Sequence, residues 1–71
     1  MDVCAHIAGT VWKLLVKAGD KVDEDQPVAI LESMKMEMPL ESPEDGIVTE
    51  LVAQEGQAVE EGDVLLRMDV G

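Results

Sequence analysis

A lysine between two methionines, Met34-Lys35-Met36, lies almost at the centre of the 71-residue chain, with Glu32 and Glu37 on either side. A lysine amine is protonated at neutral pH, so it is not a nucleophile by itself, and acidic neighbours favour the charged form. Its stem of four methylenes can nevertheless hold an attached group away from the protein body. These properties favour a lysine that another enzyme modifies over a lysine that catalyses a reaction.

The other residues able to do chemistry are a single cysteine, Cys4, and a single histidine, His6. One cysteine excludes an internal disulfide, and one cysteine with one histidine excludes the usual zinc-ligand sets. No G-x-S-x-G sequence surrounds Ser33 or Ser42, so no nucleophilic serine is indicated. We expect Cys4 to be buried or half-buried and His6 to be structural or solvated. The sequence therefore predicts no catalytic residue, no metal site and no enzyme activity of the chain's own.

Composition limits the partners of the protein. The chain has 16 acidic and 5 basic residues, a net charge of −11, and an acidic surface repels nucleic acid. No apolar run is long enough to cross a membrane, and the first residues lack the basic and apolar regions of a secretory signal. We therefore expect residues 1–71 to form one cytoplasmic domain that binds neither nucleic acid nor membrane and is monomeric in isolation.

The chain contains an internal repeat with a shift of 37 positions and no gap. From residue 9 onward, the six identical pairs are Gly9/Gly46, Val11/Val48, Leu14/Leu51, Gly19/Gly56, Val22/Val59 and Glu24/Glu61. Two copies are too few for a solenoid. They predict two similar halves that fold against one another about an approximate twofold axis.

Each half has the pattern of short β-strands. Alternation at 3–7 and β-branched or apolar runs at 10–16 and 47–52 predict strands, with glycines and prolines between them. Residues 28–38 would also permit a helix, but the repeat favours a hairpin of strands 28–33 and 36–40 that turns at Met34-Lys35. That turn lacks the Asn-Gly or Asp-Gly of a two-residue hairpin. Such a local conflict tends to mark a functional position, and the fold is predicted to be an all-β sandwich or flattened barrel.

The segment Glu32-Ser33-Met34-Lys35-Met36-Glu37 resembles the attachment site of the biotinyl/lipoyl-domain family, in particular its biotinyl branch. Further motifs follow in the family's order: Gly-x-Val from residue 9, Gly-Asp-x-Val at 19–22, Gly-Ile-Val at 46–48 and Glu-Gly-Asp-Val-Leu at 61–65. The resemblance covers nearly the whole chain. The chain is similar in its small size to single-domain biotin carboxyl carrier proteins. Because the repeat has no gap, it leaves no residues for the protruding thumb of some bacterial carriers.

The resemblance implies two antiparallel four-stranded sheets with pseudo-twofold symmetry and Lys35 at an exposed hairpin tip. It also implies that a biotin protein ligase joins biotin covalently to Lys35, and that biotin carboxylase and carboxyltransferase subunits act on the attached group. Met34 and Met36 would then serve recognition by these enzymes. Glu32, Ser33 and Glu37 complete the tip. The acceptor, an acyl-CoA or an oxo-acid, is chosen by another chain.

Two other functions remain open. A lipoyl carrier would use the same fold and tip, although its lysine usually follows Asp and precedes Ala. An unmodified module could bind a partner through an acidic sheet edge. Three local expectations complete the prediction: Trp12 packs against a sheet, Met38 lies in the core, and the turn at Asp25, where the second half has Gly62, differs from its counterpart.

Overall fold

Eight short β-strands build the protein. A computed structural model describes residues 1–70, and none of these residues lies in a helix, so the described chain offers no helix that could cross a membrane. The strands are β1 (Asp2–Cys4), β2 (Gly9–Leu14), β3 (Lys21–Val22), β4 (Pro27–Ser33), β5 (Met36–Glu41), β6 (Gly46–Leu51), β7 (Ala58–Val59) and β8 (Val64–Asp69). The hairpin interpretation of the central segment, rather than the helix, is therefore confirmed.

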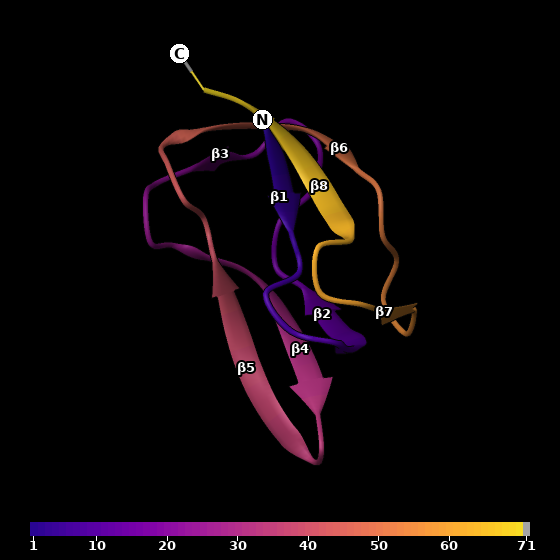
Figure 1. The fold of residues 1–71 in the computed structure, drawn as a ribbon. Coiled ribbons are helices and arrows are strands. Elements are labelled where there is room, and N and C mark those ends of the chain that lie inside the picture. Colours follow the sequence, from indigo (N-terminus) through magenta and orange to yellow (C-terminus); the bar gives the residue numbers. More distant parts are fainter. Residues whose placement is uncertain (71) are drawn as a thin grey trace.

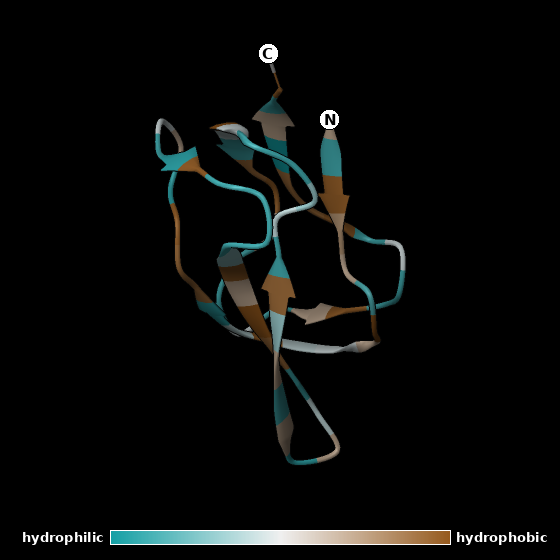
Figure 2. Cartoon of the chain, turned by 90° about the vertical axis from the view of Figure 1, so that its left-hand side faces the viewer, coloured by the Kyte–Doolittle hydropathy of each residue, from teal (hydrophilic) through white to brown (hydrophobic). Residues whose placement is uncertain are grey.

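The strands form two antiparallel sheets of four, with the orders β1-β8-β6-β3 and β5-β4-β2-β7 (Figure 1). Hydrophobic and hydrophilic residues alternate along the strands (Figure 2), so each sheet turns one apolar face inward. One core joins the two sheets; its fully buried members are Val11, Val22, Val28, Ala29, Leu31, Val48, Leu65 and Leu66. The predicted fold class is confirmed, and the sheets form a flattened sandwich rather than a closed barrel.

The two halves of the repeat occupy equivalent places. A shift of 37 positions carries β2 onto β6, β3 onto β7 and β4 onto β8. The equivalence extends to single hydrogen bonds: the Gly19 N–H donates to the Val48 carbonyl and the Gly56 N–H to the Val11 carbonyl, both at 2.7 Å. Each half therefore closes its loop on a strand of the other half, and the predicted approximate twofold relation is confirmed.

The turn at Asp25 does not differ from its counterpart at Gly62, so that expectation is wrong. Both residues have left-handed backbone conformations, with φ of 67° and 93°. Both also donate an N–H across the domain, Asp25 to the Ser42 carbonyl at 2.8 Å and Gly62 to the Ala5 carbonyl at 2.9 Å. Aspartate can replace glycine here because its short polar side chain tolerates this conformation.

Trp12 is 44% exposed, so the expectation that it packs against a sheet is also wrong. The register of β2 on β4 shifts between Val11 and Lys13, and this bulge gives Trp12 no partner on β4. Both bulge residues are exposed, and the Lys13 amine lies 5.4 Å from the centre of the indole ring. A bulge of this kind breaks the alternation of inward and outward residues on which the expectation rested.

Other differences concern strand ends. The first strand ends at Cys4, although the predicted alternation runs to residue 7, and β2 ends at Leu14, although the predicted apolar run extends to residue 16. The antiparallel contact continues for one residue past each end: the Ala5 N–H donates to the Asp63 carbonyl at 2.8 Å, and the Leu15 N–H to the Val28 carbonyl at 3.0 Å. Met38 is half-buried rather than fully in the core.

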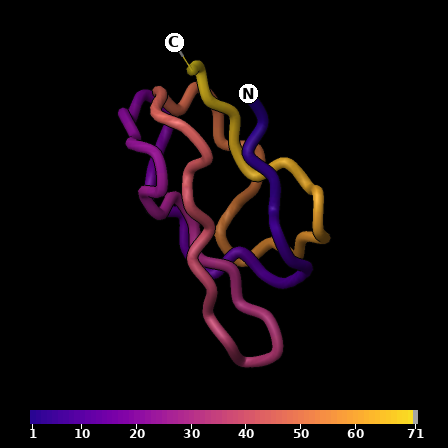
Figure 3. The backbone as a smooth tube through the Cα atoms, turned by 60° about the vertical axis from the view of Figure 1, so that its left-hand side comes forward, coloured from indigo at the N-terminus to yellow at the C-terminus, as the bar shows by residue number. Residues whose placement is uncertain are grey.

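The molecule is elongated, about 35 Å by 19 Å by 18 Å, and its two ends differ. The β4–β5 hairpin forms one end, whereas the N-terminus and the end of β8 lie together at the other (Figure 3). The N-terminal amine donates to the Met68 carbonyl there, at 2.8 Å. The fold thus places the hairpin tip at the opposite end of the molecule from the N-terminus and the end of β8.

Candidate functional site

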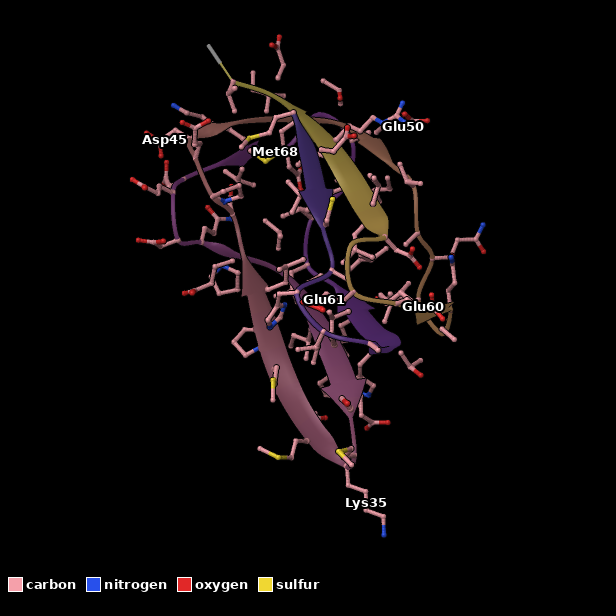
Figure 4. The ribbon with its side chains drawn as sticks, in the orientation of Figure 1. Lys35, Asp45, Glu50, Glu60, Glu61 and Met68 are labelled. Atoms are coloured by element: carbon pink, nitrogen blue, oxygen red, sulfur yellow. The ribbon has the colours of Figure 1, made fainter. Side chains whose placement is uncertain are left out.

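The hairpin of β4 and β5 extends beyond the core and ends in Lys35. Its ladder pairs Leu31 with Met38, then Glu32 with Glu37, then Ser33 with Met36, which leaves a two-residue turn of Met34 and Lys35. Leu31 is fully buried, so the six residues after it stand outside the core. Figure 4 shows the Lys35 side chain pointing away from the protein beyond the end of the ribbon. The predicted turn is confirmed.

The turn residues adopt an unfavourable backbone conformation. Met34 has φ of 52° and Lys35 has φ of 67°, and positive φ at both central residues defines a type I′ turn. The left-handed region costs a residue with a Cβ atom roughly 1–2 kcal/mol, which is why Asn and Gly usually occupy such turns. Met34 and Lys35 therefore occupy their places at a cost to stability, as residues at functional sites often do.

The side chains at the tip divide between its two faces. Met34, Lys35 and Met36 are exposed, and Ser33 is half-buried opposite Met36. Glu32 and Glu37 face one another directly across the two strands, and both are exposed. Two like charges in this position repel. The tip thus offers one amine, two exposed thioethers and an acidic pair behind them.

Two other basic side chains have partners of their own. Arg67 lies 3.3 Å from a carboxylate oxygen of Asp2 and 3.4 Å from one of Glu50, and Lys13 lies over Trp12. Lys35 is the one basic residue in the hairpin sequence from Pro27 to Glu41. The hairpin itself therefore offers a single amine.

Cys4 is half-buried, as expected, and His6 is exposed. Among residues 1–70, no three His, Cys, Asp or Glu side chains are placed to hold a metal ion. Glu32 and Glu37, the carboxylates nearest to Lys35 in the sequence, form a pair of the ladder behind the turn.

Sequence reasoning missed Gly9 as a residue that positions the hairpin. A Cβ atom at Gly9 would lie only 2.4 Å from the carbonyl oxygen of Glu32, so β2 can approach the end of β4 only without a side chain there. The equivalent Gly46 would place a Cβ atom 2.7 Å from the Asp69 carbonyl oxygen. One indication of this role was present in the sequence, because Gly9 and Gly46 are an identical pair in the repeat.

The sequence model of the biotin/lipoyl family, described as "Biotin-requiring enzyme", matches residues 2–68. The chain belongs to this family. A biotin/lipoyl attachment protein of Bacillus subtilis is 53% identical over 68 residues, which are 96% of this chain and 93% of that protein. The biotin carboxyl carrier protein of acetyl-CoA carboxylase from Solanum lycopersicum is 47% identical over 60 residues, 84% of this chain and 86% of that one.

Solved structures of both branches of the biotin/lipoyl family resemble the fold. A single-chain, multi-domain long-chain acyl-CoA carboxylase matches with a TM-score of 0.87 and 30% identity, over 93% of this chain and 6% of that one. The lipoyl domain of the 2-oxoglutarate dehydrogenase complex from Azotobacter vinelandii matches with 0.76 and 31%, over 90% and 81%. The chain is therefore a biotin/lipoyl attachment domain, and its sandwich is the fold of both branches.

The left-handed turn gives a direct test of the cost of placing a lysine at the tip. Lys35→Gly should be more stable than Lys35→Ala by roughly 0.5–1 kcal/mol, because glycine has no Cβ atom to be strained at positive φ. The difference is smaller than the full strain, because glycine also makes the unfolded chain more flexible and so favours unfolding. Urea unfolding of the two variants measures the difference.

A matched pair in the adjoining strand controls for this comparison. Glu37 does not have a positive φ, so Glu37→Gly should be less stable than Glu37→Ala, the opposite order. If alanine were the more stable residue at both positions, the backbone at Lys35 would not be strained.

Proposed function

We propose that the protein is a biotin carboxyl carrier and that biotin is joined to the Lys35 amine by an amide bond. The observation that carries the proposal is the exposed Met34-Lys35-Met36 turn, in which the lone amine of the hairpin stands at the tip between two exposed methionines. The carrier relatives support a carrier role. The proposal includes a cytoplasmic, monomeric domain without catalysis of its own.

The tip is suited to hold biotin on a long arm. The Lys35 stem and the attached group together give the reach that a carrier needs between two enzymes, while the β4–β5 ladder keeps the base of the arm fixed. Biotin held on Lys35 would supply a carrier for one carboxyl group, between a biotin carboxylase and a carboxyltransferase that acts on an acyl-CoA or an oxo-acid. This chain's residues present the arm, and the enzymes supply the chemistry.

Attachment requires a second enzyme, a biotin protein ligase. The amine forms the amide bond only after it loses a proton, and the other titratable groups of the hairpin sequence are carboxylates, which are ordinarily much weaker bases than an amine. The ligase must therefore provide both the base and the activated biotin carboxyl group. The reaction removes the positive charge of Lys35 and leaves Glu32 and Glu37 as the charges of the tip.

A lipoyl carrier is the second candidate, because the lipoyl domain from Azotobacter vinelandii has the same fold. Met34 and Met36 favour biotin over lipoate. Their exposure offers two flexible apolar side chains to a ligase that reads the residues beside the lysine. An unmodified acidic module is the third candidate, and the strained lysine turn has no purpose in it.

The test is the choice between two ligases. The protein is incubated with a biotin ligase and a lipoate ligase, each with its own acid and ATP, first separately and then together, and its intact mass is recorded. We expect one biotinyl group per chain, also in the mixture. A lipoyl group as the main product would establish the lipoyl carrier, and an unchanged mass with both ligases would favour the unmodified module.

A further inference from the structure

The five methionines of the chain differ widely in exposure. Met34 is 94% exposed, Met36 59% and Met1 49%, whereas Met38 is half-buried and Met68 is only 2% exposed. Thioethers are oxidised by peroxides in the order of their accessibility. The two methionines open to such an oxidant at the tip are therefore the two that flank Lys35.

The conformation of the turn keeps Met34 exposed. Its left-handed backbone lies at the end of a hairpin that has already left the core at Leu31, so the side chain has no apolar surface to cover it. Met36 shares a face with Ser33, two pairs further from the core than Met38. Oxidation of either residue can therefore proceed without unfolding the domain.

We propose that Met34 and Met36 form a peroxide-sensitive pair whose oxidation slows the enzymes that act at Lys35. A peroxide transfers one oxygen atom to the thioether sulfur: the O–O bond breaks, an S–O bond forms, the sulfur loses two electrons, and water leaves. The product is a methionine sulfoxide, which is polar where the thioether was apolar. Methionine sulfoxide reductases reverse this change, so the pair can act as a switch.

The effect arises at the interface with the partner enzyme. A methionine at 94% exposure contributes almost nothing to the stability of the free protein, so its oxidation should leave unfolding unchanged. An enzyme that encloses the tip must bury the two side chains, and a sulfoxide brings a polar oxygen into that contact. This part of the inference rests on the proposed function, because it supposes enzymes that bind the tip.

The first experiment maps the oxidation on the unmodified protein. The protein is treated with a limiting amount of hydrogen peroxide and each methionine is followed by peptide mass spectrometry. Met34 should react first, Met36 and Met1 next, Met38 later and Met68 last. Protein oxidised only at the three exposed methionines should keep its urea unfolding curve. Oxidation of Met68 as early as Met34, or loss of the folded state, would overturn the proposed pair.

The second experiment measures the consequence. Protein oxidised at Met34 and Met36 is biotinylated after the peroxide is removed, and its rates with limiting biotin ligase and then with biotin carboxylase are compared with those of untreated protein. We expect at least one rate to fall by about tenfold, the loss expected when one apolar contact becomes polar, and to return after treatment with methionine sulfoxide reductases. Equal rates in both reactions would overturn the switch.

Two controls separate the possible failures. In the double variant Met34→Leu, Met36→Leu, which cannot be oxidised at the tip, each rate is compared only before and after peroxide, and the two values should agree; a drop would place the sensitive residue elsewhere and overturn the inference. If untreated protein accepted no biotin at all, the proposed function would be wrong. The proposed inhibition of the partner enzymes by methionine oxidation would then be wrong as well. The oxidation map would still decide whether the two methionines are the reactive sites.

Discussion

Lys35→Arg should abolish attachment of biotin while leaving the domain folded. Arginine keeps the positive charge and a long stem, so the net charge of the hairpin tip does not change. Its guanidinium stays protonated at any pH at which the ligase works and cannot form the amide bond. The variant should therefore show no mass increase after incubation with ligase, biotin and ATP, and its urea unfolding curve should match that of the native protein.

Lys13→Arg is the matched control for Lys35→Arg. Lys13 lies on β2 over the indole of Trp12 rather than at the hairpin tip, so this variant should accept one biotinyl group at the native rate. Labelling of Lys35→Arg would show that one of the other lysines is the acceptor. Unfolding of Lys35→Arg would show that the lysine supports the fold, which its exposure does not predict.

The repeat made most of the fold predictable from the sequence. Equivalent residues such as Val11 and Val48 have equivalent surroundings, and both are fully buried, so each half served as evidence for the other. The exposure of Trp12 recurs at its repeat equivalent Thr49, where β6 shifts its register on β8 at the same place. The bulge at Trp12 follows from how β2 pairs with β4, and a pairing shift of one residue is not visible in the alternation of a single strand.

The candidate site was predictable as a position but not as a conformation. The central place of Lys35 in the repeat located the turn, against the helix propensity of the residues around it. That both Met34 and Lys35 have positive φ could not be read from their types, because neither residue favours this region. The closeness of Gly9 to Glu32 likewise depends on contacts between strands that are distant in the sequence.

Leu31→Ala should destabilise the domain far more than any substitution at the exposed hairpin tip. Leu31 is fully buried on β4, between Val11 of β2 and Met38 of β5, at the point where the hairpin leaves the core. Removing a buried leucine side chain costs about 2–5 kcal/mol, and a domain of this length has a total stability of only about 4–11 kcal/mol. Urea unfolding should show a large loss, and a part of the variant should be unfolded without denaturant.

Leu15→Ala is the control for Leu31→Ala, because Leu15 is about half exposed and its substitution should cost less than about 1 kcal/mol of stability.

Labelling of Leu31→Ala also separates the support of the hairpin by the core from the presentation of the lysine. The folded fraction of Leu31→Ala should still accept biotin, since none of the exposed tip residues has changed, but its labelling should disappear at lower urea concentrations than in the native protein. If Leu31→Ala and Leu15→Ala lost equal stability, the hairpin would not depend on the core at its base. If Leu31→Ala were labelled equally well when unfolded, the ligase would be reading the Met34-Lys35-Met36 sequence alone, and the strained turn would have no part in recognition.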